Sequence, residues 1–300
     1  MSSAFLYGMI VSSTVLHLRQ PFPQADGYAE VGQRFRMVSG ETANAAIVLA
    51  RLGVSCVVQG NWPGEENAEL IQGVLAGFGI DTRLLKTQPD YPGMDELVVS
   101  DGSTRTVFAS YKELLFEGPR RWDAADERAL AQADVCLIDP QFKELSLGAA
   151  RRARALGKKV VGIDCTADSE MLELCDVVAV SEESLGWLHP GQAFEALAPQ
   201  YLARARGLVA FTFGPKPMIY GRKGQGLKSL PAFEVQTKDT LGAGDTFKAG
   251  LGYSLLQGFG DEQSLRFAAA CAALNCQRVP GVLHSPSLAE VESFLSDKGC

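Results

Sequence analysis

Several residue patterns that mark common protein classes are missing from this chain of 300 residues. Its seven cysteines form no C-x-x-C pair, and its three histidines, at 17, 189 and 284, stand far apart, so we expect no zinc site. No apolar run approaches membrane-spanning length, and the first residues show no basic segment followed by a long apolar stretch. Most cysteines lie in apolar segments, which is typical of a reducing compartment. We therefore expect a cytoplasmic protein with no membrane partner.

A basic surface is missing as well. The chain has 28 Lys and Arg against 35 Asp and Glu, a net charge of −7, and no long Lys/Arg-rich run. This balance argues against a nucleic-acid partner. One basic cluster between Arg151 and Lys159 falls on a predicted helix and its exit, and we interpret it as a solvated face. An apolar content of 46% and a charged content of 21% are typical of a globular protein.

Short apolar runs rich in β-branched residues alternate with helical stretches along most of the chain. The strand runs are apolar without alternation, which indicates strands buried on both faces. The rhythm predicts an α/β fold of three layers, an αβα sandwich around a mainly parallel sheet. The predicted strands are 5–11, 54–58, 135–139, 160–164, 177–180 and 208–213. The predicted helices are 42–52, 65–78, 124–132, 144–156, 192–205, 244–257 and 262–277.

Two stretches, residues 12–38 and 94–111, interrupt this rhythm. The first contains alternating polar and apolar residues, and the second resembles a hairpin with a turn at Asp101-Gly102. Because both are amphipathic strands without helices, we expect them to form a small separate sheet, a lid over the mouth of the main domain. The chain shows no low-complexity linker and no internal repeat, so we expect one domain over residues 1–300 with this lid as a subdomain.

The most informative segment runs from Asp239 to Gly250 and contains the bend Gly242-Ala243-Gly244. Small residues let a ligand approach the backbone closely and leave consecutive N–H groups pointing outward. The start of the helix that follows adds the positive end of its dipole. The bend is therefore interpreted as an anion-binding site.

Asp245 directly follows this bend, where its charge would repel a bound phosphate. A catalytic interpretation is that the carboxylate takes a proton from a hydroxyl while the bend stabilises a transferred phosphoryl group. The alternative is an acidic residue that the helix dipole favours in the first turn. The bend taken alone favours the alternative.

A second glycine-rich site opens the predicted helix 42–52. Gly40 precedes this helix and Asn44 lies in its first turn, where side chains and free backbone N–H groups face the space beyond the helix end. An amide there can both donate to and accept from a sugar hydroxyl. The competing interpretation is ordinary capping by Ser39 or Thr42, with Asn44 merely exposed.

Taken together, Gly40-x-x-x-Asn44 and Asp239-Thr-x-Gly-Ala-Gly-Asp245 resemble the two signatures of the ribokinase (PfkB) family of sugar and nucleoside kinases. The resemblance covers nearly the whole chain, including both lid stretches. The residues of the second signature are most similar to those of ketohexokinase-like members. The resemblance implies an ATP- and Mg²⁺-dependent phosphotransferase with an alcohol group as acceptor, that is, a carbohydrate kinase.

The resemblance also implies roles for particular residues. Asp245 would deprotonate the acceptor hydroxyl, and the backbone of Gly242, Ala243 and Gly244 would form the anion hole for the ATP phosphates. The residues that would bind the substrate are Gly40, Asn44, Arg105 and Ser13. The residues that would bind the nucleotide are Thr212, Gly214, Thr240 and Asn275. An arginine on a strand can equally face solvent, and Asn275 can equally be a polar residue near a helix end.

The chain departs from the family pattern at four places. Ser13 stands where the family has a substrate-binding aspartate, which removes a charge-assisted hydrogen bond. Ser39 replaces the first glycine of the usual pair, and Pro217 replaces the last glycine of the nucleotide loop. The Asn-x-x-Glu that helps organise Mg²⁺ is here Ser181-Glu-Glu-Ser184, so Glu182 or Glu183 would have to substitute.

The expected function is therefore phosphorylation of a primary hydroxyl of a small sugar, of the ketohexose or pentose type. Two alternatives stay open: the same fold acting on a nucleoside or a sugar acid such as 2-keto-3-deoxygluconate, and a sugar- or nucleotide-binding sensor with weak turnover. A sugar acid requires a cation, with Arg105 the leading candidate, whereas a nucleoside requires an aromatic or apolar shelf. The exposed strands of the lid make a homodimer an expectation.

Overall fold

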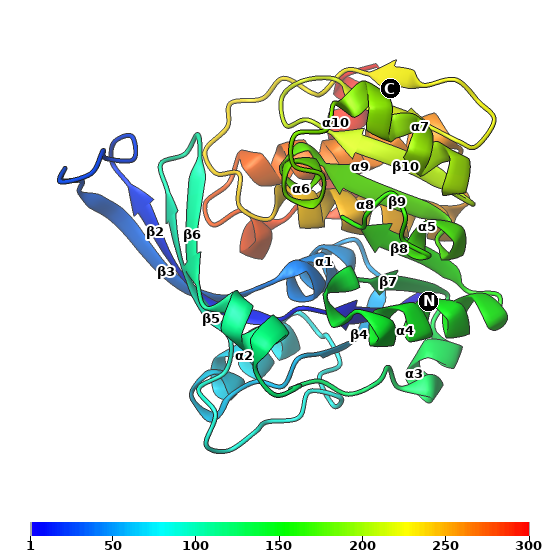
Figure 1. Ribbon diagram of the computed structural model, residues 1–300. Helices are drawn as coiled ribbons and strands as arrows, with labels where there is room; N and C mark the ends of the chain where they lie inside the picture. Colours follow the sequence, from blue (N-terminus) through cyan, green and yellow to red (C-terminus); the bar gives the residue numbers. More distant parts are fainter. Residues whose placement is uncertain (1, 300) are drawn as a thin grey trace.

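A computed structural model describes residues 2–299 as a central sheet between two layers of helices, with a small sheet projecting from one side (Figure 1). The central sheet runs in the spatial order β12 (Lys228–Leu230), β11 (Met218–Gly221), β10 (Leu208–Thr212), β9 (Val177–Ser181), β8 (Lys159–Ile163), β7 (Val135–Ile138), β1 (Ser3–Gly8) and β4 (Ser55–Gly60). Neighbours from β4 to β10 are parallel, and β11 and β12 are added antiparallel. The arrangement confirms the predicted αβα sandwich with a mainly parallel sheet.

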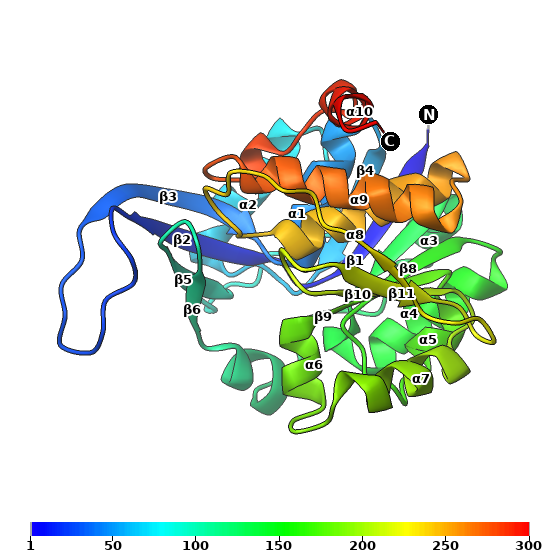
Figure 2. The ribbon, with the colours of Figure 1, turned by 90° about the horizontal axis from the view of Figure 1, so that it is seen from above.

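The helices divide between the two faces of this sheet (Figure 2). One face is covered by α1 (Glu41–Arg51), α2 (Glu65–Gly77), α8 (Ala243–Gln257), α9 (Asp261–Cys276) and α10 (Leu288–Asp297). The other is covered by α3 (Glu127–Gln132), α4 (Glu144–Ala155), α5 (Met171–Leu174), α6 (Glu182–Leu188) and α7 (Phe194–Arg204). Short helical turns lie at Lys112–Glu117, Pro140–Phe142 and Val282–His284. No helix among residues 2–299 is long and apolar enough to span a bilayer.

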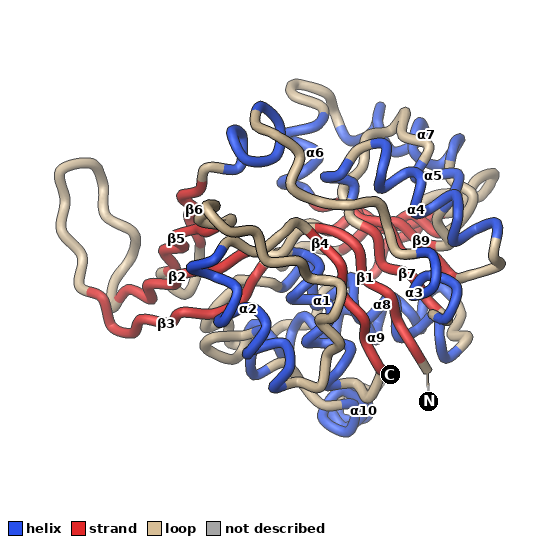
Figure 3. Tube along the Cα trace, turned by 90° about the horizontal axis from the view of Figure 1, so that it is seen from below, coloured by secondary structure: helices blue, strands red, loops and turns tan. Residues whose placement is uncertain are grey.

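Each face of the sheet has its own apolar core. Every residue of β7 is buried, and successive side chains point to opposite faces of the sheet. Val135 and Leu137 join the core on the α1/α8/α9 side, whereas Cys136 and Ile138 join the core on the α3/α4/α7 side. This two-sided burial explains why the strands are continuous apolar runs in the sequence. Figure 3 separates the red strands of both sheets from the blue helices around them.

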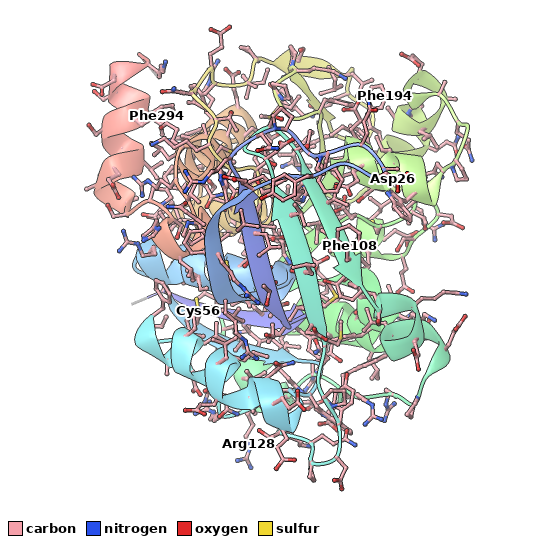
Figure 4. The ribbon with its side chains drawn as sticks, turned by 90° about the vertical axis from the view of Figure 1, so that its left-hand side faces the viewer. Asp26, Cys56, Phe108, Arg128, Phe194 and Phe294 are labelled. Carbon is pink, nitrogen blue, oxygen red and sulfur yellow. The ribbon has the colours of Figure 1, made fainter. Side chains whose placement is uncertain are left out.

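The second sheet is the predicted lid. Its strands lie in the order β3 (Val31–Ser39), β2 (Val11–Leu18), β5 (Asp95–Ser100) and β6 (Arg105–Ala109), with β2 and β5 parallel and the other pairs antiparallel. Figure 4 shows this sheet facing the viewer, with Phe108 on β6. Leu97 and its cross-strand partner Phe108 are exposed. The strand residues agree with the segments 12–38 and 94–111 expected from the sequence.

The predicted strand 5–11 was wrong at its end. The central strand β1 ends at Gly8, and Val11 already belongs to β2 of the lid. Between them the Asn61 side chain accepts from the Ile10 N–H (2.8 Å) and donates to the Ile10 carbonyl (2.9 Å). This amide replaces the strand ladder and lets one continuous apolar run pass from one sheet into the other.

Other elements differ from the prediction in extent or were not predicted. The helix predicted at 124–132 begins only at Glu127, because the Asp126 side chain accepts from the Ala129 N–H (2.8 Å) and caps it. The edge strands β11 and β12 and the helices α5, α6 and α10 were not predicted. These elements are short or lie at the edge of the fold.

Glycine allows α8 and α9 to pack closely. A methyl group on Gly250 would lie 2.6 Å from Cα of Ala268 on α9, which is too close for any side chain. We expect Gly250→Ala to lower the free energy of unfolding by about 1–3 kcal/mol, because the two helices must separate. Gly73→Ala on the exposed side of α2, where a methyl group meets nothing within 4 Å, is the matched control.

The control should instead raise the free energy of unfolding by roughly 0.5–1 kcal/mol, as Gly-to-Ala changes do within helices. Urea unfolding of both variants measures the difference. Equal effects of the two substitutions would contradict close packing at Gly250.

Candidate active site

The site forms where the N-termini of α1 and α8 meet. Each helix starts after a glycine with positive φ, Gly40 at 90° and Gly242 at 71°. A methyl group on Gly40 would lie 2.6 Å from the Met9 carbonyl oxygen, and one on Gly242 would lie 2.3 Å from a Val282 methyl. Both positions therefore require glycine for conformation and for space.

One hydrogen bond joins the two predicted signatures. The Asn44 Nδ2 donates to Asp245 Oδ2 at 2.7 Å, across 201 positions of sequence, and lies 3.4 Å from the Ser39 hydroxyl. Asn44 is only 2% exposed, so the alternative in which it is merely a surface residue was wrong. Its Oδ1 is buried without a partner among residues 2–299, so it can still accept from a ligand hydroxyl.

Asp245 is held in a state that favours proton uptake. Burial raises the pKa of its carboxyl, and the nearby Asp139 charge adds to the rise, while the Asn44 hydrogen bond and the Lys248 charge oppose it. The net result is a pKa above the ordinary aspartate value. A general base works best when its pKa approaches the operating pH. The environment of Asp245 therefore suits the catalytic interpretation.

A buried ion pair lies one helical turn beyond this carboxylate. Lys248 on α8 and Asp139, directly after β7, are both fully buried and contact each other through Nζ and Oδ1. The other Asp139 oxygen, Oδ2, accepts from the Met9 N–H (3.1 Å) and the Thr42 hydroxyl (2.8 Å). Asp139 therefore ties the starts of the lid and of α1 to α8.

A third acidic group, Glu41, completes the surroundings. Burial raises the pKa of Glu41 well above its usual value, and the charges of Asp139 and Asp245 raise it further. Its Oε1 accepts from Gln141 Nε2 (3.0 Å), and its Oε2 is buried without a partner among the described residues. Glu41 is therefore easier to protonate than a free glutamate.

Two buried polar side chains hold the backbone of the predicted anion bend in place. Asp239 is fully buried, and its Oδ1 accepts from the Leu241 N–H (3.0 Å) and the Ser100 hydroxyl (3.2 Å). The fully buried Asn275 donates to the Leu241 carbonyl (3.2 Å). Asn275 thus supports the bend, and its direct contact with a nucleotide stays a prediction.

The bend is open to a ligand at Gly244. The N–H groups of Gly244 and Asp245 lie in the first turn of α8, where the helix offers them no acceptor. A methyl group on Gly244 would meet nothing within 4 Å, so a ligand has room to approach this backbone. Thr240 precedes the bend, and its carbonyl accepts from the Ala243 N–H (3.3 Å). These residues fit the phosphate groups of a nucleotide.

The remaining predicted residues lie around this centre. Arg105 on β6 reaches from the lid to α6, where its Nη2 lies 3.0 Å from Glu183 Oε2. Glu182 pairs with Lys216 at 3.0 Å. Thr212 ends β10 and pairs in register with Ser181. Gly214 follows with φ of 61°.

Both glutamates of α6 are thus engaged with cations. Residues 2–299 contain no cluster of three or more Asp, Glu, His or Cys side chains arranged for a metal ion. A role for Glu182 or Glu183 in holding Mg²⁺ therefore stays a prediction.

The family model for pfkB family carbohydrate kinases matches residues 13–286. The chain belongs to the pfkB family of carbohydrate kinases. It is 26% identical over 281 residues to a ribokinase from Lactococcus lactis subsp. lactis, with 90% of each chain covered.

The fold of this carbohydrate kinase is similar to two solved structures. One is a putative ribokinase from Agrobacterium tumefaciens, with a TM-score of 0.86, 23% identity, and 99% and 98% of the two chains covered. The other is a putative ribokinase II from E. coli in complex with ATP and Mg²⁺, with a TM-score of 0.78, 21% identity, and 99% and 100% covered.

Three charged residues of this kinase's site had no role in the sequence-based prediction: Glu41, Asp139 and Lys248. Lys248 carried a usable signal, because a lysine between Phe247 and Ala249 on an apolar helix has to find a buried partner. Asp139 carried a weaker one as the polar residue at the end of a buried strand, the edge where parallel sheets place their sites. Their pairing, 109 positions apart, is a tertiary fact.

The buried pair makes a prediction about stability. We expect Lys248→Met alone to lower the free energy of unfolding by about 3–5 kcal/mol, because it leaves the Asp139 carboxylate buried without its cation. The double variant Asp139→Asn/Lys248→Met should recover most of this loss, since Asn keeps an acceptor for Met9 and Thr42. Urea unfolding of the two single variants and the double variant measures the coupling, and additive losses would contradict the pair.

Proposed function

We propose that this kinase transfers the γ-phosphoryl group of ATP to a primary hydroxyl of a small sugar, with Asp245 as general base. Asp245 takes the hydroxyl proton, the sugar oxygen forms a bond to phosphorus, and the bond from phosphorus to the β-phosphate oxygen breaks to release ADP. The observation that carries the proposal is the Asn44–Asp245 hydrogen bond beside the open glycine bend. It supports a base and an anion site at one helix N-terminus.

The nucleotide would lie on the α8 side of this centre. Gly242, Ala243 and Gly244 would cradle its phosphates, with Thr240, Thr212, Gly214 and Asn275 on the nucleotide side. Mg²⁺ bound with ATP would neutralise charge on the phosphates. Glu182 and Glu183 at the start of α6 are the residues that we propose to help hold it. The similar E. coli structure was solved in complex with ATP and Mg²⁺, which supports the choice of these two cofactors.

A pentose is the acceptor with most support. The relative from Lactococcus lactis is a ribokinase, which supports a pentose. The ketohexose suggested by the second signature stays a prediction. The sugar-acid alternative needs a free cation in the acceptor pocket. Arg105, the candidate for that role, has its guanidinium paired with Glu183. Homodimerisation through the exposed lid face that carries Leu97 and Phe108 stays a prediction.

The test of this function is the variant Asp245→Asn, which keeps the size of the side chain but removes the base. We expect D-ribose-stimulated release of ADP to fall about 10²- to 10⁴-fold, the usual contribution of a general base. The control is Asp297→Asn at the exposed end of α10, which should leave turnover unchanged.

Nucleotide binding by Asp245→Asn, measured by calorimetry, should persist because the glycine bend is untouched. Full turnover in this variant, with D-ribose or D-fructose as acceptor, would refute the role of Asp245.

A further inference from the structure

Glu96 is a carboxylate buried in the lid for which the reaction described above provides no role. It is 8% exposed and lies on β5. The Ser13 hydroxyl donates to its Oε1, and the Tyr111 hydroxyl donates to its Oε2. Both partners are neutral, and none of the ion pairs found within residues 2–299 includes Glu96. Burying a carboxylate without a cation costs free energy, which a role in binding a ligand would account for.

The side chain of Glu96 lies on the face of the lid that covers the active site. Side chains alternate along a strand, so Glu96 and Ser100 of β5 share a face. Ser100 on that face donates to Asp239, directly before the anion bend. Ser13 and His17 share the corresponding face of β2, and His17 Nε2 lies 3.1 Å from the Lys238 carbonyl. Two independent contacts thus orient this face towards the loop that carries the bend.

Glu96 belongs to the same electrostatic neighbourhood as the catalytic centre. Burial raises the pKa of the Tyr111 hydroxyl, and the charges of both Glu96 and Glu41 raise it further. Glu41 in turn interacts with Asp245. Glu96 and Glu41 thus both lie near the Tyr111 hydroxyl, and Glu41 lies near Asp245.

Two cations in this part of the fold are already engaged. Lys248 is bound to Asp139, and Arg105, whose charge also acts on Asp245, is paired with Glu183. The negative charge of Glu96 therefore repels an anionic acceptor, whereas hydroxyl groups can donate to its oxygens.

We propose that Glu96 binds hydroxyl groups of the phosphoryl acceptor and that its charge restricts the site to neutral polyhydroxylated compounds, so that sugar acids are rejected. The inference rests on the proposed kinase function. Each carboxylate oxygen of Glu96 keeps a lone pair beyond the one used by Ser13 or Tyr111, so adjacent hydroxyls of one ligand can donate to it. In this proposal Ser13 positions the Glu96 carboxylate, which takes the place of the aspartate that the family has at position 13.

The test compares binding of neutral and anionic probes by calorimetry. The neutral probes are D-ribose, D-fructose and uridine, and the anionic probes are D-ribonate and D-gluconate. Glu96→Gln keeps the shape and removes the charge, and Asp95→Asn, on the exposed outer face of the same strand, is the matched control. Thermal unfolding confirms that each variant is folded, and Glu96→Asp retains the charge if the Gln variant is unstable.

We expect the wild-type protein to bind at least one neutral probe and neither acid. For that probe, Glu96→Gln should raise Kd and KM about 10- to 100-fold, the loss of one charge-assisted hydrogen bond, with KM for ATP unchanged. The control should match wild type, and Glu96→Asp should bind more tightly than Glu96→Gln.

The proposal is overturned if Glu96→Gln binds the neutral probe as wild type does, or if wild type binds an acid as tightly. In either case the kinase function stands as long as Asp245→Asn still abolishes turnover. Absence of binding by every probe, together with no stimulated ADP release, would overturn both.

Discussion

The buried ion pair between Lys248 and Asp139 is the contact on which the rest of the site depends. Asp139 holds the backbone of Met9 and the hydroxyl of Thr42, and Lys248 joins this assembly to α8. The pair thereby connects the end of β7, the crossing into the lid, the start of α1 and the helix that carries Asp245. Without the ammonium group, the carboxyls of Asp139, Glu41 and Asp245 would repel one another within a region of low dielectric.

The closeness of these buried carboxyls also affects the proton affinity of Asp245. Burial and the nearby Asp139 charge raise the pKa of Asp245, while the Asn44 hydrogen bond and the Lys248 charge limit the rise. Glu41, which has no cation of its own, holds its proton more readily than a free glutamate would. The helix N-terminus beside them offers its unpaired N–H groups to an anion. A base and a phosphate site can coexist here because the Lys248 ammonium and the N-terminus of α8 offset part of the negative charge.

Much of the fold could be predicted because its causes are local. Parallel strands buried on both faces produce continuous apolar runs, and the glycines at 40 and 242 are required by backbone conformation. The helix α10 was missed although its capping box, Ser287-x-x-Glu290, is visible in the sequence. The end of β1 was missed for a different reason, since the side chain of Asn61 determines it.

The site, too, contains residues that local patterns reveal and residues that only the tertiary structure reveals. Asp245, Asn44 and the glycine bend lie in recognisable local patterns, and the structure brings them together as expected. Glu96 could not be assigned from the sequence, because its importance depends on pairing with Ser13 across 83 positions. The missing aspartate at position 13 was visible, whereas the carboxylate on the neighbouring strand was visible only once the register of the lid was known.

The most direct test of the account is the pH dependence of kcat/KM for D-ribose in the wild-type kinase. Asp245 must be unprotonated to accept the hydroxyl proton, and its pKa in the folded protein is raised. Activity should therefore be lost, as pH falls, with a midpoint above the ordinary aspartate value of 3.8. An acid limb at or below that value, in a protein that remains folded there, would contradict the claim that the carboxyl cluster tunes Asp245 as the base.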